Sequence, residues 1–374
     1  MQFRTRRAFL VPGRTDRATR IRPTLQIFLI ACFAVVFVGC RSRGLTSVRA
    51  RGVSPLVVDD PRTDFRPTPW GPFVASIETP AMGVVVDALC GPDRARCKAT
   101  CGERKEARSF AACAIDALYG DDSESWTLAR ELFDEHGTLP GTGAVHVIDA
   151  GYLGVMNTRA ALPKGAYRHH LQWLVKGLRT IESVIAAVAT TSSEPVLFRT
   201  RPHAVMFYKT DVPSYPSAYA MENVVGYNLE GPLHESEHKV MATLFHEIFH
   251  LNDAGHGDWS DRALSPLFSA ILETCADDDA CLEPYAPDDT KVPGGTYYPF
   301  DPRTAAVREY AAEIGERWFV EHRAIVERGE QPEQAFKCAT SLNADAWSQV
   351  VGEFFGGVDL VAECPTPAPS SEES

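Results

Sequence analysis

The sequence contains the run His246-Glu247-Ile248-Phe249-His250 inside a stretch of helical periodicity. On a helix the two histidines lie one turn apart on the same face, where both imidazoles can reach one zinc ion. The glutamate between them then lies beside the open coordination position and can take a proton from a metal-bound water. A fold that uses this run must bring a third metal ligand to the same helix. The alternative interpretation is a helix that carries two histidines by accident.

The charge of the chain limits its partners. Its 374 residues, enough for one large or two ordinary domains, carry a formal net charge of −12. Arginines are concentrated in residues 1–39, so removal of that segment would leave a still more acidic chain. Such a chain is a poor candidate for binding nucleic acid or an anionic membrane surface. We therefore expect no nucleic-acid partner.

Residues 1–39 have the features of an export signal. An arginine-rich segment precedes an apolar run over residues 25–39, which is shorter than the roughly 20 residues that a membrane-spanning helix needs. The run ends in Phe37-Val38-Gly39-Cys40, which resembles a bacterial lipoprotein signal. The resemblance implies that Cys40 carries a lipid and anchors the protein in the cell envelope. The residue after Cys40 is Arg41, and not an acidic residue that would retain a lipoprotein in the inner membrane. The outer membrane is therefore favoured. The alternatives are a cleaved signal that gives a secreted protein, or an N-terminal membrane anchor.

Eight cysteines remain after Cys40, and an even number in an exported chain predicts up to four disulfides. They are Cys90, Cys97, Cys101, Cys113, Cys275, Cys281, Cys338 and Cys364. We expect Cys275 and Cys281 to close a short loop on each other. The alternative is a second zinc site formed by the first four, but their spacing does not match paired C-x-x-C motifs.

The composition along the chain suggests five segments. We expect an export signal over 1–39, a lipid-attached flexible tether over 40–80, a helical cysteine-rich region over 81–140, a main domain over 141–364 and a disordered tail over 365–374. The cysteine-rich region shows helical patterns over 109–119 and 125–136. It is either a separate subdomain or an addition to the main core.

The main domain alternates helical and strand patterns. Helices are predicted over 167–190, 236–252, 264–274 and 305–328, the last helix of the chain. Strands are predicted over 144–148, 202–209 and 223–229, and a long loop over 284–304. These elements predict an α+β fold with a small mixed sheet. Zinc peptidases commonly have this order around an H-E-x-x-H helix, so we expect a zincin-like metallopeptidase core.

Three residues compete to be the third metal ligand. His256 gives the H-x3-H-x5-H spacing of the metzincin peptidases, but that family needs glycine where this chain has Asp253 and a methionine turn after the site. Glu273 begins an E-x-x-x-D pattern with Asp277, although acidic residues at a helix end are the more common explanation.

Glu309 is the third candidate, in the run Glu309-Tyr310-Ala311-Ala312-Glu313. The alanines would let this helix approach the H-E-x-x-H helix closely enough for a short carboxylate to reach a metal ion bound there. Glu313 lies one turn further on and could accept a hydrogen bond from the other nitrogen of a ligating imidazole. The alternative is an ordinary solvated amphipathic helix.

The H-E-x-x-H run and the Glu309–Glu313 run together resemble the catalytic domain of the anthrax lethal factor group of gluzincin peptidases. The resemblance covers roughly residues 239–319. It implies that Glu309 is the third zinc ligand and that Glu313 supports a ligand. The group also has a catalytic tyrosine shortly before this glutamate. The candidates here are Tyr297 and Tyr298, which lie farther upstream.

These observations predict a zinc-dependent peptidase that hydrolyses peptide bonds with a metal-activated water. Glu247 would act as general base, and Tyr298 or Tyr297 would stabilise the oxyanion. We expect the 223–229 strand to be an edge along which a peptide or protein substrate docks. His256 and Asp258 follow the H-E-x-x-H helix closely and could line the cleft, although a capped turn is the more common explanation. The alternative function is that of an inactive zinc-binding surface lipoprotein that acts as a binding module.

Overall fold

The computed structural model describes residues 79–91, 93–143, 147–149, 154–210, 216–286, 291–304 and 306–365. The predicted export signal, the predicted lipid-attachment site at Cys40, nearly all of the predicted tether and nearly all of the predicted tail lie outside these residues. In the described part the structure has eleven α-helices and a curled mixed sheet. The α+β class is therefore confirmed, whereas the zincin-like core stays a prediction.

The cysteine-rich region is helical, as predicted. It contains α1 (Met82–Cys90), α2 (Arg94–Cys101), α3 (Ala107–Tyr119) and α4 (Ser123–His136). Buried residues of α1, α3 and α4 belong to the same hydrophobic core as those of the central helices and strands. The region therefore shares its core with the main domain.

All eight cysteines are paired in disulfides, so the alternative zinc site at the first four is not formed. The pairs are Cys90–Cys97, Cys101–Cys113, Cys275–Cys281 and Cys338–Cys364. The predicted Cys275–Cys281 loop is confirmed. Disulfides of this kind are typical of proteins in an oxidising, extracellular compartment. Among the described residues, none of the helices combines the length and the apolar character needed to cross a membrane.

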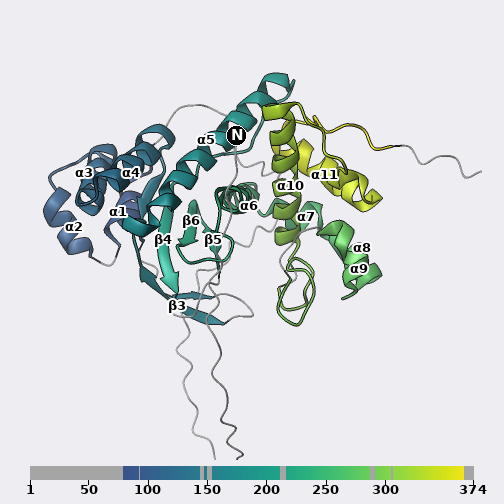
Figure 1. Ribbon diagram of the computed structural model, residues 1–374, viewed down its shortest axis with the longest axis horizontal. Helices are drawn as coiled ribbons and strands as arrows, with labels where there is room; N and C mark the ends of the chain where they lie inside the picture. The colour runs from purple at the N-terminus through teal and green to yellow at the C-terminus, as the bar shows by residue number, and fades with distance from the viewer. Residues whose placement is uncertain are drawn as a thin grey trace, which may run out of the picture. The chain divides into compact units, whose positions relative to one another are not determined.

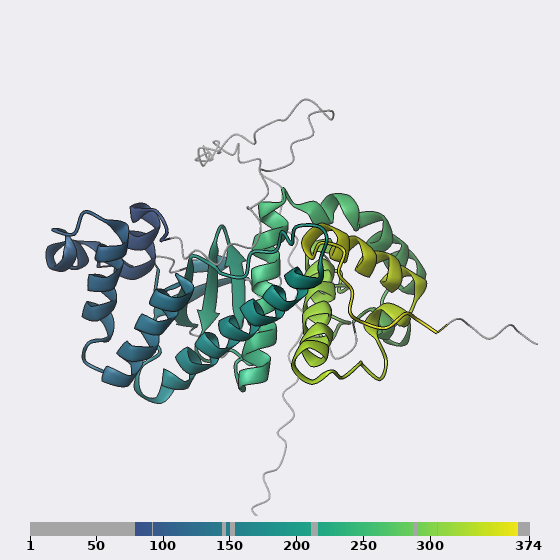
Figure 2. The same cartoon turned by 90° about the horizontal axis from the view of Figure 1, so that it is seen from above.

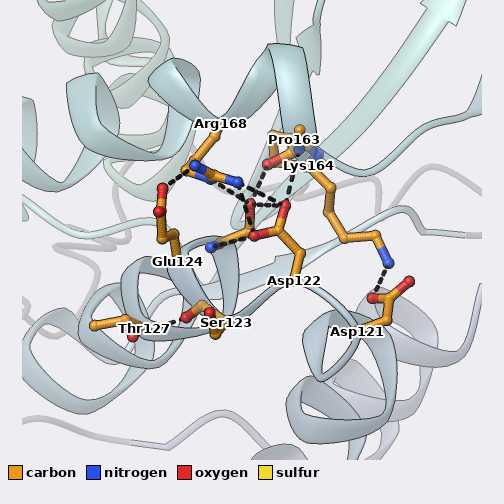
Figure 3. Close-up of polar contacts among 10 residues, drawn as sticks. Asp121, Asp122, Ser123, Glu124, Thr127, Pro163, Lys164 and Arg168 are labelled. Carbon is orange, nitrogen blue, oxygen red and sulfur yellow. Dashed lines mark hydrogen bonds and ion pairs between the residues drawn. The ribbon is translucent and has the colours of Figure 1, made fainter.

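A polar cluster joins the α3–α4 corner to the start of the central helix α5 (Arg168–Thr191) (Figure 3). The Asp122 carboxylate caps α4 by accepting from the Ser125 amide at 3.1 Å. It also accepts from the Gly165 amide at 2.9 Å and from Arg168 Nη2 at 3.0 Å. Lys164 Nζ pairs with Asp121 at 2.5 Å. One carboxylate therefore satisfies donors at the beginnings of two helices.

The sheet has the strand order β2-β3-β4-β6-β5, and β1 also pairs with β4. Its strands are β1 (Leu139–Gly141), β2 (Val147–Asp149), β3 (Val155–Ala160), β4 (Ala204–Thr210), β5 (Ala218–Met221) and β6 (Val224–Asn228). The pairs β1–β4 and β4–β6 are parallel, and the other pairs are antiparallel.

The predicted 202–209 and 223–229 strands correspond to β4 and β6. The expectation that the 223–229 strand forms an edge was wrong, because β6 lies between β4 and β5. The edge strand on that side is β5, which the sequence did not reveal. Of the predicted 144–148 strand, residues 144–146 lie outside the described residues, and β2 begins at Val147.

The predicted long helices are confirmed within a few residues. They are α5, the H-E-x-x-H helix α6 (Glu237–Gly255), α8 (Ser265–Cys275) and α10 (Val307–Arg328). Short helices α7 (Trp259–Ala263) and α9 (Asp279–Leu282) flank α8. The expectation that α10 is the last helix was wrong, because α11 (Ser341–Phe354) follows it.

Two views show how these elements surround the centre. Helix α6 lies between the sheet and α10, and α5 crosses both helices (Figures 1 and 2). Helices α1–α4 cover the sheet on the side away from α10, while α7, α8, α9 and α11 lie on the far side of α6 from the sheet (Figure 1). Helix α6, which carries the H-E-x-x-H run, is therefore the innermost helix of the fold.

Three histidines gather where α5 begins. The His170 ring nitrogen Nδ1 lies 2.9 Å from the hydroxyl of Tyr227, and the His234 ring stacks on the Tyr227 ring at 3.8 Å. Burial, and then the positive charges that His169 and His234 can carry, lower the pKa of His170 to about 3. His170 is therefore neutral in the folded protein near pH 7.

Acidification should destabilise the protein through His170. The unfolded chain binds a proton at this residue below its ordinary pKa of 6.5, and the folded protein does so only near pH 3. We expect the free energy of unfolding to decrease as the pH falls through this window. In His170→Gln the decrease should be smaller, and in the control His238→Gln, an exposed histidine, it should be unchanged. Urea unfolding between pH 7 and 4 measures this, and equal slopes in wild type and His170→Gln would contradict it.

Candidate metal centre

Helix α6 presents its two motif histidines on the side opposite its main packing face. The Ser236 hydroxyl caps the helix by accepting from the Lys239 amide at 3.3 Å. Phe245 and Ile248 point into the core and are almost fully buried. The 3.6-residue period then leaves His246 and His250 side by side and partly exposed, with ring centroids 4.8 Å apart.

Small residues bring α10 close to α6. Ala311 and Ala312 are completely buried, in agreement with the predicted close approach. Gly315 packs tightly against α6, because a Cβ added there would stand 2.2 Å from Cδ2 of Phe249. A side chain at this position would therefore force Phe249 or one of the two helices to move.

Glu309, in the first turn of α10, completes a triangle of ligand atoms with the two histidines. His246 Nε2 and His250 Nε2 are 3.1 Å apart, and each lies 3.4 Å from Glu309 Oε2. Bonds of about 2.0–2.1 Å at tetrahedral angles separate neighbouring ligands of zinc by about 3.3 Å. The three atoms can therefore bind one divalent metal ion without rearrangement.

Charge also favours this arrangement. Burial alone would raise the pKa of Glu309, but the adjacent histidines outweigh it and hold the pKa well below its ordinary value. For His246, burial is outweighed by the three nearby carboxylates, which raise its pKa. The attraction between these groups holds the Glu309 carboxylate against both imidazoles.

Two further glutamates face the other nitrogen of His246. Glu313 Oε1 lies 3.4 Å from Nδ1, which agrees with the predicted supporting position. Glu316 Oε2 lies 3.5 Å from the same atom. Sequence analysis missed Glu316, although its separation of seven residues from Glu309 places it on the same face of the helix.

Glu247 lies beside the triangle without belonging to it. Its side chain is 8% exposed, and burial raises its pKa, while the charges of His250 and His246 partly offset that increase. Burial, Tyr219 and the charge of Glu247 raise the pKa of Tyr208 on β4. The Tyr208 hydroxyl is already used, since it donates to the carbonyl oxygen of Pro216 at 3.1 Å.

The other candidate ligands lie elsewhere. His256 Nδ1 pairs with Glu353 Oε1 at 2.7 Å, and Glu273 is exposed on α8. Within the described ranges, neither belongs to a group of side chains that could hold a metal ion. Asp258, expected to line the cleft, pairs with Arg308 at 3.3 Å.

The two candidate tyrosines lie in the loop that precedes α10. Tyr297 is buried, and Lys291 Nζ stands 4.5 Å from the centre of its ring. Tyr298 is 37% exposed, and its carbonyl oxygen accepts a hydrogen bond from the Thr304 hydroxyl. Tyr298 therefore has the more accessible ring of the two, and a catalytic role for either stays a prediction.

Comparison with protein-family models, curated proteins and solved structures finds no match to this chain. The interpretation of the site therefore depends on its own geometry.

Removal of the Glu309 carboxylate should abolish tight metal binding. Loss of a supporting residue around a metal ligand costs about 10–100-fold in affinity, so loss of the ligand itself should cost more than about 100-fold. We expect Glu309→Ala to show this loss and Glu273→Ala, which changes an exposed glutamate outside the site, to bind zinc like the wild type. Competition with a chromophoric chelator measures the affinity. Weaker binding by Glu273→Ala than by Glu309→Ala would contradict this assignment.

A methyl group at position 315 should separate the two helices. Gly315→Ala forces Phe249 or α10 to move, and overpacking of this kind costs about 1–3 kcal/mol. The control is Gly352→Ala on α11, where nothing lies within 4 Å and the change should stabilise by up to about 1 kcal/mol. Urea unfolding measures both, and zinc affinity should fall only in Gly315→Ala. Stabilisation by Gly315→Ala would show that the helices are not held at this distance.

Proposed function

We propose that this chain is an exported zinc-dependent peptidase. The observation that carries the proposal is the triangle formed by His246 Nε2, His250 Nε2 and Glu309 Oε2, with sides of 3.1, 3.4 and 3.4 Å. Glu247, the residue expected to move the proton, lies next to this triangle in sequence and in the field of the same charges.

The donor set supports zinc in a catalytic site. Two imidazoles and one carboxylate are the three protein ligands of several zinc hydrolases, which keep the fourth position for water. Structural zinc sites usually close all four positions with cysteine and histidine, but the eight cysteines that the structure describes are in disulfides. Among the described residues, the group around His246 Nε2 offers three ligand atoms, so one position is left for water or substrate.

Each side chain then has a defined task. Zinc, when bound, supplies Lewis acidity and lowers the pKa of a bound water toward neutrality. His246, His250 and Glu309 hold the ion, and Glu313 orients His246. Glu247 takes the proton from the attacking water and passes it to the leaving amine. Because Glu247 is buried, bulk water has little access to the carboxylate during this transfer.

A peptide substrate has an edge strand on which to dock. In the described part of the chain, β5 is the edge strand of the sheet next to α6, and it pairs with β6. An extended peptide can pair with such an edge through its backbone. This arrangement supports a peptide or protein substrate that lies between β5 and the paired histidines.

The four disulfides support an exported protein, because such bonds persist in oxidising compartments. Attachment of a lipid at Cys40 and location in the outer membrane remain predictions from the sequence. Mass spectrometry of the N-terminal peptide from membrane-bound protein would detect the lipid.

The variant Glu247→Gln tests the catalytic proposal. It keeps the size of the side chain and the three ligands but removes the base, so we expect zinc binding to be retained. Hydrolysis of a fluorogenic peptide library should fall by at least about 100-fold, the lower end of what general-base catalysis contributes. Glu237→Gln, on the same helix but paired with Lys176, should leave both properties unchanged. Hydrolysis by Glu247→Gln at the wild-type rate would refute the base assignment. Zinc-loaded wild type without activity would instead favour the inactive binding protein.

A further inference from the structure

Three glutamates form one stripe along α10. Glu309, Glu313 and Glu316 are separated by four and three residues, so all three face α6. Each has a carboxylate oxygen within 3.5 Å of a ring nitrogen of His246. Glu309 approaches Nε2, whereas Glu313 and Glu316 both approach Nδ1. Glu309, as a ligand, and Glu313, as its support, follow the pattern expected from sequence, but nothing in that pattern accounts for Glu316.

Nδ1 of His246 has only one hydrogen to donate, so the presence of a second carboxylate beside it needs an explanation. When Nε2 binds a metal, Nδ1 carries a single hydrogen and can donate to one acceptor at a time. Glu313 Oε1 at 3.4 Å and Glu316 Oε2 at 3.5 Å are almost equally distant from it. Their side chains are only 12% and 20% exposed, so both are held in place rather than free in solvent.

We propose that Glu316 is a second positioning residue for the metal centre, which shares with Glu313 the single hydrogen on Nδ1 of His246. This inference rests on the proposed zinc site. Either carboxylate alone can accept the hydrogen and keep the imidazole in the tautomer that leaves Nε2 available to zinc. Both together increase the electron density that the ring offers to the ion.

A hydrogen that two acceptors share has a measurable consequence. If either carboxylate suffices, loss of one is compensated by the other, and loss of both is not. The effects on zinc affinity in a double-mutant cycle must then be more than additive. Two glutamates that merely pack α10 against α6 would give independent effects.

The experiment compares the full chain with Glu313→Ala, Glu316→Ala and the double variant. Alanine removes the acceptor and is well tolerated in a helix. We expect each single change to weaken zinc binding by less than about tenfold and the double change by about 100-fold or more. Chelator competition gives the affinity, and elemental analysis gives the zinc equivalents per chain. The control is Glu327→Ala, which lies farther along α10 and pairs with Arg323 at 2.9 Å. It should bind zinc like the wild type.

A second pair of variants separates hydrogen bonding from charge and from folding. Glu316→Gln keeps an acceptor oxygen and nearly the same volume. In the Glu313→Ala background, Glu316→Gln should therefore retain more zinc affinity than Glu316→Ala. Circular dichroism verifies that each variant is folded, and the Glu313→Met, Glu316→Met double variant, whose side chains have a similar volume but no acceptor oxygen, replaces the alanine pair if that pair does not fold. Its effect on zinc affinity should still exceed the sum of the two single effects.

Three results would overturn the inference. Additive effects of the two changes would show that the carboxylates act separately. No effect of Glu316→Ala in the Glu313→Ala background would show that Glu316 does not contact the ring. A second zinc equivalent that disappears in Glu316→Ala would show that Glu313, Glu316 and His246 hold another cation. Wild type that binds no zinc would instead refute the proposed function itself, so the two failures are distinguishable.

Discussion

The contact between α6 and α10 governs the rest of this structure. The three ligands of the proposed site, His246, His250 and Glu309, and the carboxylates beside them all come from these two helices. Their separation is set where Gly315 meets the Phe249 ring. At that separation, a short carboxylate from α10 reaches the imidazoles of α6. The sheet packs against α6, and α5 packs against both helices, so these elements hold the two helices in place.

Stacked aromatic rings in the hydrophobic core keep α6 in its orientation. The Phe245 ring lies between those of Phe198, at 4.9 Å, and Phe319, at 4.4 Å, and is nearly parallel to both. Asn252 fixes the end of α6, since it accepts from the Arg199 amide at 2.7 Å and donates to the Arg199 carbonyl oxygen at 2.9 Å. Rotation of α6 about its axis would break these contacts. The direction in which His246 and His250 point is therefore a property of the core.

The sequence predicted the parts of this fold that depend on local pattern. The long helices α5, α6 and α10 have strong apolar periodicity and defined ends. The spacing of His246 and His250 placed both on one face of α6, whereas Glu309 was one of three candidates and was favoured by the resemblance of its run to the gluzincin motif. The short strands β3 and β5 escaped, because Val155–Ala160 and Ala218–Met221 are poor in β-branched residues and only partly buried. The place of β6 inside the sheet depends on pairing between distant segments, which periodicity does not encode. Glu316 escaped because an additional glutamate on a helix is usually a surface residue.

The four disulfides cross-link the chain, and a metal ion bound by the triangle would cross-link it over a longer distance. The bridged cysteines are 7, 12, 6 and 26 residues apart, whereas His246 and Glu309 are 63 residues apart. The entropy lost when a loop is closed increases with the logarithm of its length. An ion that joins His246 to Glu309 would thus restrict the unfolded chain more than any single disulfide does. A reducing agent would then loosen the periphery of the molecule, whereas a chelator would release its centre.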